Sequence, residues 1–403
     1  MTRSMRPTPV TNDLALVLGG GGARGAYQAG LLRYISRQYP HLSIPILVGI
    51  SAGAINTTHL ASHRGTFAES VEDLVKIWRS IVPEDVYRVD ARSLLSNVVR
   101  SGFGLVSGES VQDQRVRGMV DSTPLRAFLE RVLERAPDGS LPGIQHNLRR
   151  GSLNAVALSA TSYTTGCSTT WVEGENVTPW ERAQRRSVQT RLSVDHVMAS
   201  AALPLFFPAE RVGSEWFGDG GIRLTAPLSP ALHLGASRLL TISTRRKRHR
   251  SECVEPQIVG YPAPAQVLGV LYNAVFLDVI DQDVSRLERI NDLVAKIPPG
   301  QRGEMRAIEI LVLRPSIDLG VLAREYESRL PRVFRFLTRG LGTRKSTSPS
   351  ILSVLMFQED YIRRLVELGE SDAERHASQI SAFIEGGYPK TIEKSGTPSS
   401  AGP

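Results

Sequence analysis

Two glycine-containing motifs, each directly after an apolar run, constrain the fold of this chain more than any other feature. Residues 14–18 are apolar and precede the glycine-rich run 19–25, which leads into a helical pattern. Residues 44–50 form a second apolar run, followed by Gly-Ile-Ser-Ala-Gly at 49–53 and another helical pattern. A strand, a tight turn and a helix, given twice, are typical of a parallel sheet covered by helices. The sequence therefore predicts an α/β fold with a mainly parallel sheet flanked by helices.

Composition and hydrophobic spacing predict how the rest of the chain is organised. We expect a flexible N-terminus at 1–12, a main domain over 13–245 and a mainly helical extension over 246–390 that packs on it. Weak patterning marks 83–150 as an insertion or lid region, and the polar residues 391–403 predict a disordered tail. Further strands are expected at 153–160, 238–243 and 308–313, and helices at 26–38, 52–62, 194–202, 265–293 and 354–368.

The charge and the cysteine content narrow the class of protein. The chain has 403 residues and a net charge of +8, which favours an anionic partner, although an arginine bias also reflects genome composition. Two cysteines, Cys167 and Cys253, are too few for a disulfide framework, so a reducing compartment is expected. No run approaches the ~20 apolar residues of a membrane span. We therefore expect a cytoplasmic protein whose membrane contact is peripheral.

The glycine run is suited to holding an anion, but it lacks the residues of two common phosphate-binding motifs. Glycines before a helix let backbone N–H groups converge on a phosphate or an oxyanion. A dinucleotide site needs an acidic residue ~20 positions further on, and the chain has no Asp or Glu between Asp13 and Glu69. A P-loop needs a Gly-Lys-Ser/Thr sequence after the glycines, which is missing here. The glycine run therefore does not favour binding of NAD, FAD or a nucleoside triphosphate.

The second motif predicts a nucleophile. In Gly-x-Ser-x-Gly between a strand and a helix, the serine stands exposed on a sharp turn at the carboxyl edge of the sheet, so Ser51 is a candidate nucleophile. Its base is less obvious, because none of the eight histidines has a special context. Asp219, between aromatic residues and two glycines, is either a turn residue or a carboxylate on a tight loop near apolar surface. Burial of such a carboxylate raises its pKa and makes it a better base.

Three motifs together resemble the patatin-like phospholipases: Gly-Gly-Gly-Ala-Arg-Gly at 20–25, Gly-Ile-Ser-Ala-Gly at 49–53 and Asp-Gly-Gly at 219–221. The resemblance implies a Ser–Asp dyad without a catalytic histidine, with Ser51 as nucleophile and Asp219 as its base. It also implies an oxyanion hole and further motif glycines. The oxyanion-hole residues would be Gly20, Gly21, Gly22, Arg24 and Gly25, with Arg24 orienting the loop or meeting a phosphate, and the motif glycines would be Gly49, Gly53, Gly220 and Gly221.

The resemblance implies a serine hydrolase that cleaves carboxylic ester bonds of phospholipids or lysophospholipids through an acyl-serine intermediate. No metal and no cofactor are expected. The partners expected are the lipid substrate and, through the basic run 245–250, an anionic membrane surface, although this run is equally typical of a solvated loop. No nucleic-acid partner is expected, because no recognition motif is present. The alternative is a non-catalytic regulatory protein that binds a phosphorylated ligand in the glycine nest.

Overall fold

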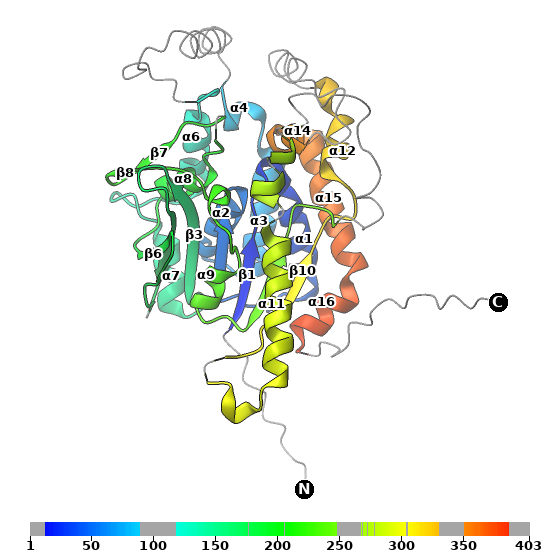
Figure 1. Ribbon diagram of the computed structural model, residues 1–403. Helices are drawn as coiled ribbons and strands as arrows, with labels where there is room; N and C mark the ends of the chain where they lie inside the picture. Colours follow the sequence, from blue (N-terminus) through cyan, green and yellow to red (C-terminus); the bar gives the residue numbers. More distant parts are fainter. Residues whose placement is uncertain are drawn as a thin grey trace, which may run out of the picture.

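A mixed β-sheet forms the centre of the protein, with helices on both faces (Figure 1). The computed structural model describes residues 13–88, 118–175, 177–204, 206–247, 267, 269–271, 273–277, 279–303, 305–329 and 350–386. Within these residues ten strands pair in one sheet, in the order β10-β9-β1-β2-β3-β4-β6-β5, with β8 pairing to β3 and β7 to β8. Pairing is parallel from β10 to β3 and between β4 and β6, and antiparallel elsewhere. The predicted α/β class with a mainly parallel sheet is confirmed.

The strands are β1 (Leu14–Leu18), β2 (Ile46–Ile50), β3 (Ala155–Ser162), β4 (Ser168–Gly174), β5 (Glu181–Arg182), β6 (Arg185–Gln189), β7 (Glu210–Val212), β8 (Glu215–Asp219), β9 (Arg238–Ile242) and β10 (Glu309–Leu313). The α-helices are α1 (Gly25–Gln38), α2 (Ala52–Ser62), α3 (Phe67–Ser80), α4 (Pro83–Val86), α6 (Thr123–Val132), α7 (Pro142–Arg150), α8 (Val194–Ala201), α9 (Ser229–His233), α11 (Val279–Lys296), α12 (Leu319–Arg324), α14 (Ser350–Leu355), α15 (Glu359–Arg375) and α16 (Ala377–Ile384). Short 3-10 turns η1 (Gly22–Arg24), η2 (Gly220–Ile222), η5 (Pro299–Gln301) and η6 (Glu327–Arg329) and a π-helical turn η4 (Asn273–Leu277) complete the described elements.

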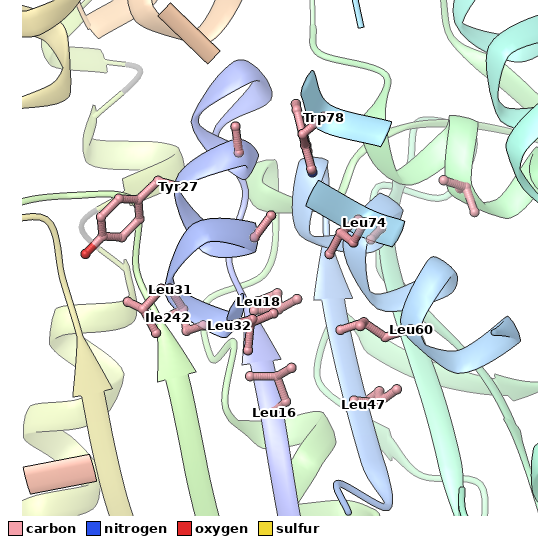
Figure 2. Packing of buried hydrophobic residues seen from close by; sticks show 14 of the residues in the cluster. Leu16, Leu18, Tyr27, Leu31, Leu32, Leu47, Leu60, Leu74, Trp78 and Ile242 are labelled. Atoms are coloured by element: carbon pink, nitrogen blue, oxygen red, sulfur yellow. The ribbon is translucent and has the colours of Figure 1, made fainter. Parts of the chain in front are cut away.

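The alternation of side chains along β1 explains the two layers of helices. Leu16 and Leu18 belong to a large core cluster shared with α1, α2, α3 and α15, whereas Ala15 and Val17 belong to a second cluster shared with α9 and α11. Successive side chains of a strand point to opposite faces, and a strand that is apolar throughout is therefore covered on both. Figure 2 shows the first of these layers, where leucines of the sheet lie against side chains of α1, α2 and α3, with Trp78 at one end.

The strands and helices next to the two motifs agree with the sequence analysis. The strand predicted at 14–18 and the helix predicted at 52–62 have the predicted limits, and the strand and helix expected at 238–243 and 194–202 end one residue earlier. The strand expected at 308–313 begins one residue later and forms one edge of the sheet, parallel to β9. Segments beyond residue 245 thus contribute both to the sheet and, through α15, to its principal core.

One predicted helix is wrong as a continuous element, and another contains a π-helical turn. Of the helix expected over 265–293, every described residue from 267 onward is helical, with η4 as a π-helical turn and α11 ending at Lys296. In place of one helix over 354–368, α14 ends at Leu355 and α15 begins at Glu359. This break has a clear packing reason. Phe357 lies in the gap and stacks on Trp78, with ring centroids 6.5 Å apart, and Tyr87 donates a hydrogen bond to the carbonyl of Leu355.

Several boundary predictions fall outside the described residues, namely the N-terminal segment 1–12, the tail 391–403 and residues 89–117 of the proposed insertion. The described parts of 83–150 include α4, α6 and α7. The division at residue 245 stays a prediction.

Candidate active site

The candidate nucleophile occupies a strained turn between β2 and α2. Ser51 has φ 56° and ψ −127°, and Gln184 is the only other non-glycine residue with positive φ in the described chain. Such a conformation is unfavourable for a residue with a side chain and persists only where surrounding structure enforces it. Gly53 permits the turn, because a Cβ there would lie 2.1 Å from the carbonyl oxygen of Leu18. Gly49 has the same role, since a Cβ at this position would lie 2.5 Å from the carbonyl oxygen of Gly53.

The turn is anchored from β3 and α8. The backbone N–H of Ser51 donates to the hydroxyl of Ser200 at 3.0 Å. That hydroxyl in turn donates to the carbonyl of Ser159 at 2.7 Å. All three residues are buried, with Ser51 7% exposed. The strained backbone of the serine is therefore held by a buried hydrogen-bond relay.

The glycine run leaves β1 and comes close to this serine. A Cβ on Gly20 would lie 2.9 Å from the Cβ of Ser51 and 3.5 Å from its Oγ. Gly21 and Gly22 have φ values of 152° and 56°, and the chain enters η1 and then α1. No hydrogen bond to the described part of the chain occupies the N–H groups of Gly20 and Gly21. These donors are available at the N-terminal end of a helix, where the helix dipole adds positive potential.

Arg24 holds this loop from behind. Its side chain is 3% exposed, its Nε donates to the hydroxyl of Ser353 at 2.6 Å, and its guanidinium also donates to the carbonyl of Thr244. Of the two roles expected for Arg24, orienting the loop agrees with this burial, whereas a direct contact with a phosphate does not. The hydroxyl of Thr244 donates to the carbonyl of Gly20 at 2.7 Å, which fixes the loop from the end of β9.

A buried network supports the loop from α1, α2 and α3. Gln28 donates to the carbonyl of Gly19 at 2.8 Å. Asn56 donates to the side chain of Gln28 and to the carbonyl of Gly25, and accepts a hydrogen bond from the indole of Trp78 at 2.7 Å. Fully satisfied buried networks fix a single arrangement. Gly25 also allows close packing, because its Cβ would lie 2.6 Å from the Trp78 ring.

Asp219 ends β8 beside the serine turn and is fully buried. Its backbone N–H donates to the carbonyl of Ala202, and its Oδ1 accepts a hydrogen bond from the N–H of Gly221 at 2.8 Å. Its other oxygen, Oδ2, is buried without a partner of full hydrogen-bond geometry in the described chain. Gly220 allows the turn to pass close to β3, because its Cβ would lie 2.1 Å from the oxygen of Ser159.

The electrostatic state of Asp219 suits a base. Burial raises the pKa of its carboxyl to about 6, while the hydroxyl of Ser51 and the N–H of Gly221 act in the opposite direction and lower the pKa. Burial raises a carboxyl pKa because the charged form loses its hydration. The structure thus brings Ser51 and Asp219 together, and a carboxylate with a pKa near neutrality can accept a proton from a neighbouring hydroxyl.

An apolar cavity opens from Ser51 and reaches between the helices. It holds about 630 Å³ of empty space, counting the part open to solvent. Among the described residues, no charged side chain lines this cavity. Most of the lining comes from α2, α3, α4, α6, α14 and the loop after α8. The lining comprises Gly22, Ser51, Ala52, Ile55, Ile77, Trp78, Ile81, Val86, Leu125, Phe128, Leu129, Ala201, Leu203, Phe207, Val354, Leu355 and Phe357.

A second, smaller cavity is lined by Asp219 but not by Ser51. Gly20, Asp219 and Gly221 contribute to its lining, together with Val275 and Phe276 from η4. Phe276 lies directly against the motif, because a Cβ on Gly221 would be 2.4 Å from its ring. Each of the two candidate dyad residues therefore lines a different cavity.

The described histidines lie away from both cavities. Among the described residues, no histidine lines either cavity. His59 bonds to the carbonyl of Ser70, His196 contacts Ser193, and burial lowers the pKa of both imidazoles to about 4. Within the described part of the chain, no group of three or more His, Cys, Asp or Glu residues is arranged to hold a metal ion. The described helices also include none with both the length and the apolar character needed to cross a membrane.

The residues that support the site were not predicted from the sequence. Ser200 lies outside the three motifs, and nothing in the sequence indicated its bond to the serine turn. Ser353 and Phe276 lie far along the chain in regions without a recognisable motif. Gln28 was detectable only as a polar residue within an otherwise apolar helix face.

A comparison with known protein families supports the family resemblance that the three motifs indicated. The family model described as patatin-like phospholipase matches residues 16–232, which is more than half of the chain. The matched region includes all three motifs. No curated protein matches the chain.

Solved structures that are similar to this chain include a human phospholipase and two bacterial proteins. One is human GIVD cytosolic phospholipase A2 in complex with methyl gamma-linolenyl fluorophosphonate, with 14% identity, a TM-score of 0.45 and coverage of 93% of this chain and 59% of that chain. VipD from Legionella pneumophila has 12% identity, a TM-score of 0.32 and coverage of 91% and 72%. The ExoU–SpcU complex of the type III secretion system of Pseudomonas aeruginosa has 13% identity, a TM-score of 0.28 and coverage of 92% of this chain and 77% of that chain. The chain thus spans about three fifths of the human protein's length.

Proposed function

Because the chain belongs to the patatin-like phospholipase family, we propose that it is a serine lipid acyl hydrolase that cleaves carboxylic ester bonds of phospholipids or lysophospholipids. Ser51 is the nucleophile and Asp219 the base that activates it. The observation that carries the proposal is the buried Asp219 carboxyl, whose pKa is about 6, beside a serine on a strained turn at the end of an apolar cavity.

The first half of the reaction forms an acyl-enzyme. Ser51 Oγ attacks the ester carbonyl carbon while Asp219 takes the hydroxyl proton. The carbonyl oxygen becomes an oxyanion, and the N–H groups of the Gly20–Gly22 run stabilise it, at roughly 3 kcal/mol for each donor. The tetrahedral intermediate collapses, Asp219 returns the proton to the departing alcohol, and the acyl chain stays on Ser51.

The second half releases the fatty acid. A water molecule gives a proton to Asp219 and attacks the acyl carbonyl, so that the ester bond to Ser51 breaks and the serine recovers its proton from Asp219. The uncharged lining around Ser51 supports a hydrocarbon chain as the occupant of the larger cavity.

The test is direct product analysis. Vesicles of mixed phospholipids and lysophospholipids are incubated with the protein, and free fatty acids are measured by mass spectrometry. Release is expected to fall at least 1,000-fold in Ser51→Ala, the scale expected when a nucleophile is removed. The matched control is Ser62→Ala at the other end of α2, where the hydroxyl bonds only to the carbonyl of His59. Unchanged release in a folded Ser51→Ala protein would refute the proposal.

A further inference from the structure

A third cavity lies away from the two that Ser51 and Asp219 line. It holds about 950 Å³ of empty space, counting the part open to solvent, and it shares no lining residue with the other two. Leu47 of β2 and Leu60 of α2 line it. Figure 2 shows both leucines at the opposite end of the core layer from Trp78, which lines the cavity at Ser51. The third cavity is therefore separate from the candidate active site.

Buried hydrogen bonds fix the walls of the third cavity. The side-chain amide of Asn147, near the end of α7, donates to the carbonyls of Ala61 and His63 at 2.8 Å each. The carbonyl of Asn147 accepts hydrogen bonds from the N–H groups of Ser152 and Leu153. All five residues line the cavity, and satisfied buried networks hold a single arrangement. The walls are thus formed without a ligand, as in most small-molecule sites.

The inner part of the third cavity is apolar. Ile44, Leu47, Leu60 and Leu153 line it with buried side chains, and Phe67 lines it with a partly buried ring. Ligand pockets are lined mostly by such side chains, with a small number of polar groups that fix the orientation of the ligand. This part of the cavity therefore suits a hydrocarbon group.

The outer part is polar and carries a positive charge. Arg150, the last residue of α7, and His41 are exposed and line the cavity together with Ser43 and Ser152. The guanidinium of Arg150 forms no hydrogen bond or ion pair within the described part of the chain, and no Asp or Glu of that part lines the cavity. Arginine binds carboxylates and phosphates through paired N–H groups. The unpaired guanidinium thus favours an anionic headgroup.

Two carboxylates in the first half of α3 do not alter this preference. Glu69 accepts hydrogen bonds from the N–H and the hydroxyl of Thr66 at 2.7 and 2.9 Å. Asp73 accepts a hydrogen bond from Lys76 at 2.7 Å and contacts Nε2 of His63 at 3.1 Å. Both carboxylates are thus occupied by neighbouring donors. Among the described residues, a cationic ligand in this cavity would therefore meet no unpaired carboxylate on the lining.

We propose that the third cavity binds an amphiphilic anion with a single hydrocarbon chain, whose chain lies on Leu47, Leu60 and Leu153 and whose headgroup meets Arg150. Its volume of about 950 Å³ lies within the range of small-molecule sites. A fatty acid and an alkyl phosphate both have this chemistry. The inference goes beyond the proposed function and does not rest on it, because Ser51 does not line this cavity.

The binding experiment titrates the native chain in a calorimeter with four probes that share an eight-carbon chain: octanoate, octyl phosphate, octanol and octylammonium. At least one anion should bind roughly fivefold more tightly than octanol and octylammonium, the scale of an exposed ion pair. The tighter anion identifies the headgroup as carboxylate or phosphate. No binding of either anion, or equal binding of anions and octylammonium, would overturn the proposal.

Two arginine variants locate the headgroup. Arg150→Gln should weaken binding of the anion roughly fivefold and leave octanol binding unchanged. The matched control is Arg149→Gln, since Arg149 is the preceding residue of α7, is also exposed and does not line the cavity. The control should bind the anion as the native chain does. Equal losses in the two variants would show that only the general positive charge matters, and the site would be refuted.

Photolabelling identifies the cavity that holds the hydrocarbon chain. A diazirine analogue of octanoate is irradiated with the protein, and the labelled peptides are mapped by mass spectrometry. The label should lie within 40–47, 60–70 or 147–153, and excess octanoate should displace it. Ser43→Trp should remove this label, because the exposed Ser43 lines the cavity and the larger ring would fill it. Label confined to 77–86 or 125–129, next to the cavity at Ser51, or label that persists in Ser43→Trp, would contradict the proposal.

Discussion

Replacing Asp219 by Asn should stabilise the protein at neutral pH while abolishing its activity. The carboxyl is fully buried, and its pKa is raised from 3.8 to about 6. Because the folded state holds the proton more tightly than the unfolded state, stability is greatest below pH ~4 and falls as the pH rises through ~6. The rise in pKa corresponds to about 3 kcal/mol, since each pKa unit is worth about 1.36 kcal/mol. Asparagine has nearly the same shape and no charge to desolvate.

The assay is urea unfolding of the native chain and of Asp219→Asn at pH 4 to 8. Between pH 4 and pH 8 the difference in unfolding free energy should change by about 2.5 kcal/mol in favour of the variant, because part of the total change occurs below pH 4. Most of it falls below pH ~6. Lipid hydrolysis by the variant should be undetectable at every pH. A difference that does not vary with pH would show that Asp219 has an ordinary pKa, and the argument for a desolvated base would be refuted.

Three further predictions concern the loop, the cavity and the base. Gly22→Ala should abolish turnover and destabilise the fold, because the new Cβ would lie 2.2 Å from the Val354 carbonyl oxygen. The control is Gly139→Ala, also at positive φ but with nothing within 4 Å of the new Cβ. It should lower the free energy of urea unfolding by only about 1 kcal/mol. Ile77→Phe should shift the acyl preference toward shorter chains, measured as kcat/KM across a chain-length series, because Ile77 lines the larger cavity. In the native chain, log kcat/KM should fall with unit slope below pH ~6 as Asp219 becomes protonated; a flat profile down to pH 5 would exclude it as the base.

The parts of the fold that were predictable from sequence are those with local signals. An apolar run ended by glycines marks β1 and β2, because strands buried on both faces need no polar alternation. The positions of Ser51 and Asp219 were predictable for a similar reason. Each stands between glycines that the structure requires for close backbone approach, as at Gly53 and Gly220. The family model over residues 16–232 covers this predictable part.

What the sequence did not predict depends on contacts between distant segments. Arg24 bonds to Ser353, 329 residues away, and no spacing rule connects them. The helix expected at 354–368 is interrupted because Phe357 is buried against Trp78, a tertiary contact that overrides a local helical pattern. The π-helical turn at Asn273–Leu277 places Phe276 against Gly221, and this turn was not predicted either. Apolar spacing alone cannot distinguish such residues from those of an uninterrupted helix.

The central claim is that Ser51 is a nucleophile activated by Asp219, and a fluorophosphonate probe followed by peptide mapping tests it most directly. The native chain should be labelled at Ser51, and both Ser51→Ala and Asp219→Asn should lose the label. His196→Gln should keep it, because His196 bonds to Ser193 and lines neither cavity. Labelling of Asp219→Asn at the native rate, or loss of labelling in a folded His196→Gln chain, would contradict the dyad.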